Sequence, residues 1–158
     1  MDGKRIVDRG WLRRIWLCVL AGMVLFSIQD ILLWQRIFEA NEMWEFVGTY
    51  HEGWFIMLWA LIAMGFLWTR CWRTGLLHAT MMVTLAFGGL PDVLYYWLRA
   101  LPIPARLPWL DAHPLILFSP VTSINLLFST GLWIGFWLTA TILMSNGIRI
   151  TLRKRLRI

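Results

Sequence analysis

The chain has 158 residues, of which 59% are hydrophobic and 15% are charged; it contains 12 tryptophans and carries a formal net charge of +6. So little polar sequence cannot cover the surface of a soluble domain of this length, which excludes that class and predicts a single integral membrane domain. The basic residues gather at loops and chain ends, which indicates membrane topology, and no nucleic-acid partner is expected.

Four segments are long and apolar enough to cross a bilayer as helices, which takes about 20 residues each. A backbone in lipid must pair its own hydrogen-bonding groups, so the segments are expected to be helices and not strands. The predicted fold is therefore an all-α integral membrane protein, a bundle of four transmembrane helices. The predicted spans cover approximately residues 15–34, 53–69, 75–98 and 121–144.

The distribution of Lys and Arg predicts the orientation of this bundle. Basic residues precede the first span, fill the turn between the second and third, and follow the fourth, whereas most acids fall in the loops at 35–52 and 99–120. Cytoplasmic loops carry the Lys/Arg excess, so both termini are expected in the cytoplasm and both loops outside, with the plasma membrane as the expected location. The lipid bilayer itself is a partner, and anionic headgroups are expected at the basic termini, including the tail at 145–158.

The first two spans place polar residues near the outer face. Gln29 and Asp30 lie near the outer end of the first span, and His51 and Glu52 lie at the outer mouth of the second. In the loop between them, three glutamates recur at every third residue, which predicts a short helix lying on the outer interface.

The third span ends in FGGLPDVLYYWLRAL, residues 87–101, which places two glycines, a proline and an aspartate in an apolar segment. Pro91 lacks an amide donor and crowds the carbonyl four residues earlier, so a kink is expected, which Gly88 and Gly89 can absorb. Tyr96 follows Asp92 by one helical turn and Arg99 by two. Asp92 is interpreted either as reaching the interface and pairing with Arg99, or as part of a polar pocket inside the bundle.

The loop at 99–120 contains five prolines, which discourage helix and predict a stiff, turn-rich cap over the polar residues. A His/carboxylate metal site at this face is one interpretation, although the residue spacing matches no known metal motif. Its candidate ligands are His51, Glu52, Asp111 and His113. No motif in the sequence identifies a cofactor.

The fourth span carries Asn125 about one turn below its outer end. Trp133 and Trp137 share one helix face and are interpreted either as packing residues or as an aromatic wall for a ligand. Gly131 and Gly135 form a GxxxG pair, which lets a second helix approach closely. The pair therefore predicts a helix contact within the bundle, with a protein partner, or in a homodimer.

All four spans thus place polar groups in the same outer third. A charge inside a span costs about 2.5–3.5 kcal/mol on insertion scales, so it usually faces the bundle interior and has a partner. Asp30 and Asp92 are expected to share that interior, where two close carboxyl groups hold a proton or bind a cation. The expected catalytic group is Asp92 as acid or base, assisted by Asp30, Glu52 and His51. The expected ligand-binding residues are Gln29, Tyr96, Arg99, Asn125, Trp133 and Trp137.

Two classes of function fit this pattern. The first is an intramembrane enzyme or binder that acts from the outer leaflet on a lipid-phase molecule, such as an isoprenoid or a sterol-like compound. The second is a non-catalytic accessory or assembly subunit of a larger membrane complex, which the small size and the lack of a catalytic motif favour. The four-span plan with acids near one face is similar in architecture to the sterol-isomerase and sigma-2-receptor group. No motif of that group aligns with this chain, so no residue's role is carried over.

Overall fold

The computed structural model describes residues 10–69 and 71–156; the side chains of residues 38, 44 and 145–156 lie outside this description. Over the described ranges the chain is helical and forms no β-strand, and one isolated antiparallel bridge pairs Arg106 with Thr122. The prediction of an all-α fold is confirmed. Most of the basic residues assigned to lipid headgroups, at 4, 5, 9, 70 and within 145–158, fall outside the described side chains.

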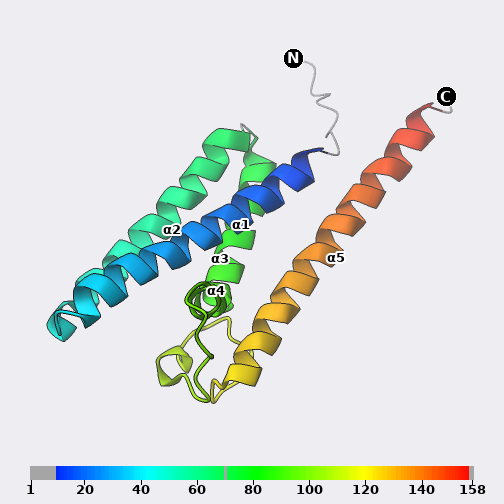
Figure 1. The fold of residues 1–158 in the computed structure, drawn as a ribbon. Coiled ribbons are helices and arrows are strands. Elements are labelled where there is room, and N and C mark those ends of the chain that lie inside the picture. The colour runs from blue at the N-terminus through cyan, green and yellow to red at the C-terminus, as the bar shows by residue number, and fades with distance from the viewer. Residues whose placement is uncertain (1–9, 70, 157–158) are drawn as a thin grey trace.

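Five α-helices and three shorter helical segments follow one another along the chain (Figure 1). The π-helix η1 continues α1 without a break, and η2 and η3 are 3₁₀ turns. In chain order the elements are α1 (Gly10–Asp30), η1 (Ile31–Glu39), η2 (Trp44–Phe46), α2 (Val47–Thr69), α3 (Trp72–Phe87), α4 (Leu90–Leu98), η3 (Pro108–Leu110) and α5 (Ser123–Leu156).

Three helical segments are long and apolar enough to cross a membrane: Gly10–Ile37, Val47–Thr69 and Ser123–Met144. The pair α3 and α4 passes the same test as a unit, but the two helices are bent by 63° at a short break. The chain is therefore a membrane protein with three candidate spans, or four when the bent pair is counted as one. The third predicted span is two helices joined by a break and not a single kinked helix.

The elements divide between two ends of the bundle. The start of α1, the turn between α2 and α3, and the end of α5 lie at one end, whereas η1, α4 and the loop 99–122 lie at the other (Figure 1). We call the second the loop end. The main core lies between α1, α2 and α3, with Trp137 of α5 at its border; it includes Val19, Met23, Phe26, Leu58, Ile62, Met81, Met82 and Leu85.

The α2–α3 hairpin packs closely because of a glycine at the contact. A Cβ added to Gly65 would lie 2.0 Å from Nδ1 of His78, so only a residue without a side chain admits the imidazole there. Small residues allow this kind of backbone approach between membrane helices, which gain little from apolar burial against lipid.

The break between α3 and α4 is formed by Gly88 and Gly89 and not at the proline. Gly89 has a φ of +94°, a left-handed conformation that costs a residue with a side chain about 1–2 kcal/mol. A Cβ on Gly88 would lie 2.5 Å from the Thr84 carbonyl oxygen. Pro91 stands in the first turn of α4, where a missing amide proton leaves no helical hydrogen bond unmade.

Other elements supply donors for the carbonyls around this break. The Thr130 hydroxyl of α5 donates to the Gly88 carbonyl at 3.1 Å, and the Ser27 hydroxyl of α1 donates to the Pro91 carbonyl at 3.1 Å. The His113 imidazole, from the loop, hydrogen-bonds the backbone of Phe87. Buried backbone groups need such partners, so the break is a packed feature of the fold.

Two predicted boundaries differ from the observed ones. The first outer loop, expected over 35–52, is mostly occupied by η1 and by the early start of α2, and its three glutamates lie in η1, in the following turn and in η2. The prediction of one short interfacial helix that carries all three glutamates is therefore wrong. At the other end of the chain, the backbone of α5 continues as helix to Leu156, well past the predicted end of the span at 144.

Candidate functional site

Two acidic residues from different helices interact electrostatically at the loop end. Asp30 is the last residue of α1 and accepts a hydrogen bond from the hydroxyl of Tyr50, in the first turn of α2. Asp92 lies in the first turn of α4, and its carboxyl group interacts electrostatically with that of Asp30. Both acids that the sequence placed in a shared interior thus lie within electrostatic range of each other.

The first turn of α4 explains how Asp92 is held. The first amides of a helix have no partner within it and favour a negative charge nearby. The Asp92 carboxyl group accepts a hydrogen bond from its own backbone amide and another from the Trp109 indole, which belongs to η3. The break before α4 thus creates the helix end that fixes the acid, and the loop reaches across to it.

Arg99 does not pair with Asp92, which corrects one interpretation of the sequence. Its Nη1 donates to the Tyr95 hydroxyl at 2.6 Å, and its guanidinium lies 5.2 Å from the centre of the same ring. A second, smaller apolar core lies under the loop 99–122, and Tyr96 packs against it. Tyr96 also interacts electrostatically with Asp92. Tyr95, which the sequence reasoning did not select, is therefore the residue that positions the arginine.

The four candidate metal ligands are not gathered into a site. Among the described residues, no three His, Cys, Asp or Glu side chains lie together in an arrangement that would hold a metal ion. His51 and Glu52 are exposed at the start of α2. Asp111 instead organises the loop, because it accepts from the Val121 amide at 2.7 Å and from Arg106 at 2.9 Å. These two donors hold the pKa of the Asp111 carboxyl group below its usual value.

His113 is the fourth of these candidates, and it contacts the helix break. Its ring lies 5.9 Å from the ring of Phe87, and its burial lowers the pKa of the imidazole. A neutral imidazole has one N–H donor, and that of His113 hydrogen-bonds the backbone of Phe87. The buried Nδ1 atom has no hydrogen-bond partner among the described residues. His113 therefore ties the loop to the end of α3.

The ligand-binding candidates on α5 make contacts inside the protein. The indole nitrogen of Trp133 donates to the Leu115 carbonyl at 2.8 Å, and that of Trp137 donates to the Thr84 hydroxyl at 2.7 Å. The Asn125 amide donates to the Pro120 carbonyl at 2.9 Å, near the start of α5. All three fasten α5 to the loop or to α3. Gln29 differs, because its Oε1 is buried and has no hydrogen-bond partner among the described residues.

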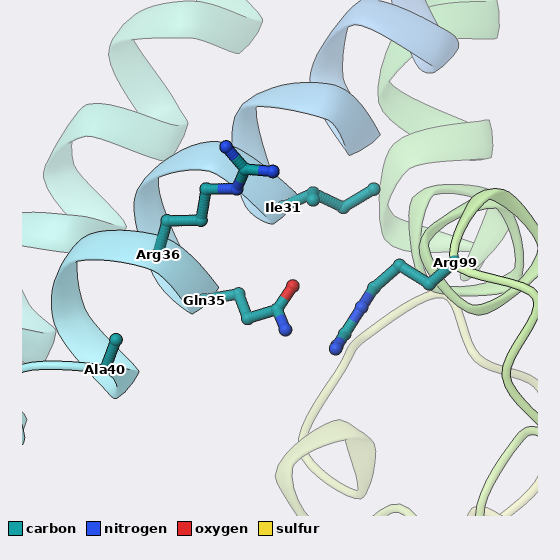
Figure 2. Close-up of a pocket in the computed structure, with 5 residues that line it drawn as sticks. All are labelled: Ile31, Gln35, Arg36, Ala40 and Arg99. Carbon is teal, nitrogen blue, oxygen red and sulfur yellow. The ribbon is translucent and has the colours of Figure 1, made fainter.

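An open pocket lies between η1 and the end of α4, with a volume of about 610 Å³. Figure 2 shows Gln35 and Arg99 extending toward the same space from opposite sides. The pocket is lined by Ile31, Gln35, Arg36, Ala40 and Arg99.

Tyr50, the three pocket residues of η1 and Ala40, which follows them, escaped the sequence reasoning for different reasons. The second span was expected to begin at residue 53, which left Tyr50 in a loop, whereas α2 begins at Val47. The signal for the pocket was the presence of Arg36 and Arg99 on a face that carries few basic residues. Comparison with protein-family models, with curated proteins and with solved structures finds no match to this chain.

Proposed function

We propose that the protein crosses the plasma membrane four times, with both termini in the cytoplasm, and binds a lipid-phase molecule at Asp30 and Asp92. Counting α3 and α4 as one span makes the number of spans even, and the ends of the bundle in Figure 1 fit this topology. The excess of basic residues near the termini and in the α2–α3 turn supports the cytoplasmic side. The loop end then lies at the outer leaflet.

The interaction of Asp30 with Asp92 is the observation that carries the proposal. Acids within membrane helices are costly and usually mark a functional site. A protonated carboxyl group near an ionised one offers a donor as well as acceptors, which suits a hydroxyl or carbonyl group on an isoprenoid or sterol-like molecule. Tyr50 hydrogen-bonds Asp30 and leaves Asp92 as the better placed group for proton transfer.

Native mass spectrometry of the protein, gently extracted from its own membrane, tests this proposal. We expect one lipid-like mass to remain bound in stoichiometric amount, with no second polypeptide. A stoichiometric polypeptide in place of that mass would support the subunit function instead. The bare chain under conditions that preserve a known lipid complex of another membrane protein would contradict a tightly bound ligand.

The second candidate function, an accessory subunit of a membrane complex, is favoured by the surface of α5. A Cβ added to Gly131 or Gly135 would meet no atom within 4 Å, so this GxxxG pair makes no helix contact within the described structure. Nearby large apolar side chains on the same helix are also exposed, among them Leu132 and Phe136. The pair remains available to a partner helix or to a second copy.

Gly131→Leu tests this second function. If α5 docks on a partner through the glycine pair, the bulkier side chain prevents close approach and the partner, or the second copy, is lost on purification. Gly53→Leu, in α2, is the matched control, because an added Cβ there also meets no atom within 4 Å, and it should leave assembly unchanged. Identical complexes from both variants would argue against docking through this face.

A further inference from the structure

The pocket between η1 and the end of α4 is basic and lacks an acid in its lining. Two of its five lining residues are arginines, a third is a glutamine, and the other two are Ile31 and Ala40. A guanidinium group without a carboxylate partner attracts an anion, which binds it through charge-assisted hydrogen bonds. A pocket of this composition selects for negative charge.

The π-helix explains why residues from successive turns of the chain line one pocket. In an α-helix, Arg36 would point about 140° away from Ile31, because each residue turns the helix by about 100°. A π-helix pairs residue i with residue i+5, so Ile31 lies over Arg36 and Gln35 over Ala40. π-helical turns are rare and occur often at functional sites, and here the turn creates the pocket wall.

The two arginines of the pocket are not neutralised within the protein. Among the described side chains the single ion pair joins Arg106 to Asp111, so neither Arg36 nor Arg99 has a carboxylate at ion-pair distance. The hydroxyl of Tyr95 fixes Arg99 by one nitrogen, Nη1, and a guanidinium has further N–H groups to offer a ligand. The nearest acid on η1, Glu39, interacts with Tyr95 but does not line the pocket.

We infer that this pocket binds the anionic phosphate headgroup of a membrane lipid. Guanidinium groups recognise phosphate oxygens through paired hydrogen bonds, and the Gln35 amide adds a neutral donor. The exposed Leu98 and Leu101 flank Arg99 in sequence, and Leu32 and Ile37 flank Arg36, so the arginines stand among apolar surface that acyl chains can cover. The inference rests on the proposed function for the orientation alone, since that proposal places the loop end at the outer leaflet, where lipid headgroups lie.

Lipid binding to the purified protein tests this inference, with dioctanoyl phosphatidic acid as the anionic probe and dioctanoyl phosphatidylcholine as the net-neutral one. We expect the wild type to prefer phosphatidic acid. Arg36→Gln and Arg99→Gln should each weaken phosphatidic acid binding by about tenfold or more, the effect of losing a charged hydrogen bond. Arg106→Gln removes the same charge from the same end of the bundle, outside the pocket, and should leave the affinity unchanged.

Arg36→Gln is the decisive variant, because Arg36 is exposed and its replacement should not disturb folding. Equal affinity for both lipids, or an equal effect of Arg36→Gln and Arg106→Gln, would overturn the inference. Inorganic phosphate that displaces phosphatidic acid at an equal concentration would also overturn it, since the pocket would then take the free ion. The inference and the proposed function fail separately, because Asp92→Asn should remove the endogenous mass while phosphatidic acid binding depends on the arginines.

Discussion

Replacing Gly89 by alanine is expected to lower the free energy of unfolding by about 2–4 kcal/mol. The φ of +94° at this position is unfavourable for any residue with a Cβ, and the added atom would lie 2.3 Å from Cδ1 of Leu126. The cost combines backbone strain with overpacking of the small core under the loop, in which Leu126 is fully buried. Unfolding of the detergent-solubilised protein, followed by circular dichroism, measures the change.

Gly135→Ala is the matched control, because an added Cβ there meets no atom within 4 Å. Alanine is the better helix former, so this variant should be as stable as the wild type or slightly more stable. Gly88→Ala provides a second test of the break, since its Cβ would approach the Thr84 carbonyl, a backbone atom that cannot rotate away. If the Gly89 and Gly135 variants unfold alike, the break does not depend on a left-handed residue.

The spans could be predicted because the signal for them is local. A sufficiently long run of apolar residues predicts a membrane helix regardless of the neighbouring sequence. The segments Gly10–Ile37, Val47–Thr69 and Ser123–Met144 follow that rule. A kink was expected at Pro91, with Gly88 and Gly89 absorbing it, but not a break of 63° between two separate helices. Proline marks where a helix is weakened, but here the chain uses Pro91 to begin α4 and two glycines to end α3.

The contacts of individual site residues could be predicted only in part. Equal depth in the membrane predicted that Asp30 and Asp92 would meet, because depth follows from position along each span. Depth does not say which way a side chain points around its helix, so Arg99 was assigned to Asp92 although it bonds to Tyr95. The π-helix could not be predicted, since π-helical turns are rare and no residue pattern in η1 marks one.

The break in the third span and the candidate site are parts of one arrangement. Ending α3 early frees the α4 N-terminus within the bundle, and that helix start binds the Asp92 carboxyl group. The same break exposes the Phe87 backbone to His113 and the Gly88 carbonyl to Thr130. The loop and α5 are therefore fastened to the break whose geometry positions the acid.

Asp92→Asn is expected to reduce retention of the bound lipid-phase molecule by about tenfold or more, the cost of removing a charged hydrogen-bond partner. Asparagine has nearly the same shape and keeps an acceptor for the amide of residue 92 and for Trp109, so the helix start should survive. An amide, however, neither carries the charge nor exchanges the proton that a carboxyl group offers. Native mass spectrometry measures retention, and thermal unfolding shows whether the fold is intact.

Asp111→Asn is the matched control, since Asp111 belongs to the same end of the bundle but serves the loop through Val121 and Arg106. It should leave ligand retention unchanged while weakening the loop.

Asp30→Asn, alone and combined with Asp92→Asn, shows whether the two acids bind one ligand together or act independently. If Asp30 and Asp92 act on one ligand, the double variant should be no worse than either single variant, because the first change already removes the paired site. Additive losses would mean that the two acids act independently, and full retention in Asp92→Asn would assign that residue to capping α4 alone.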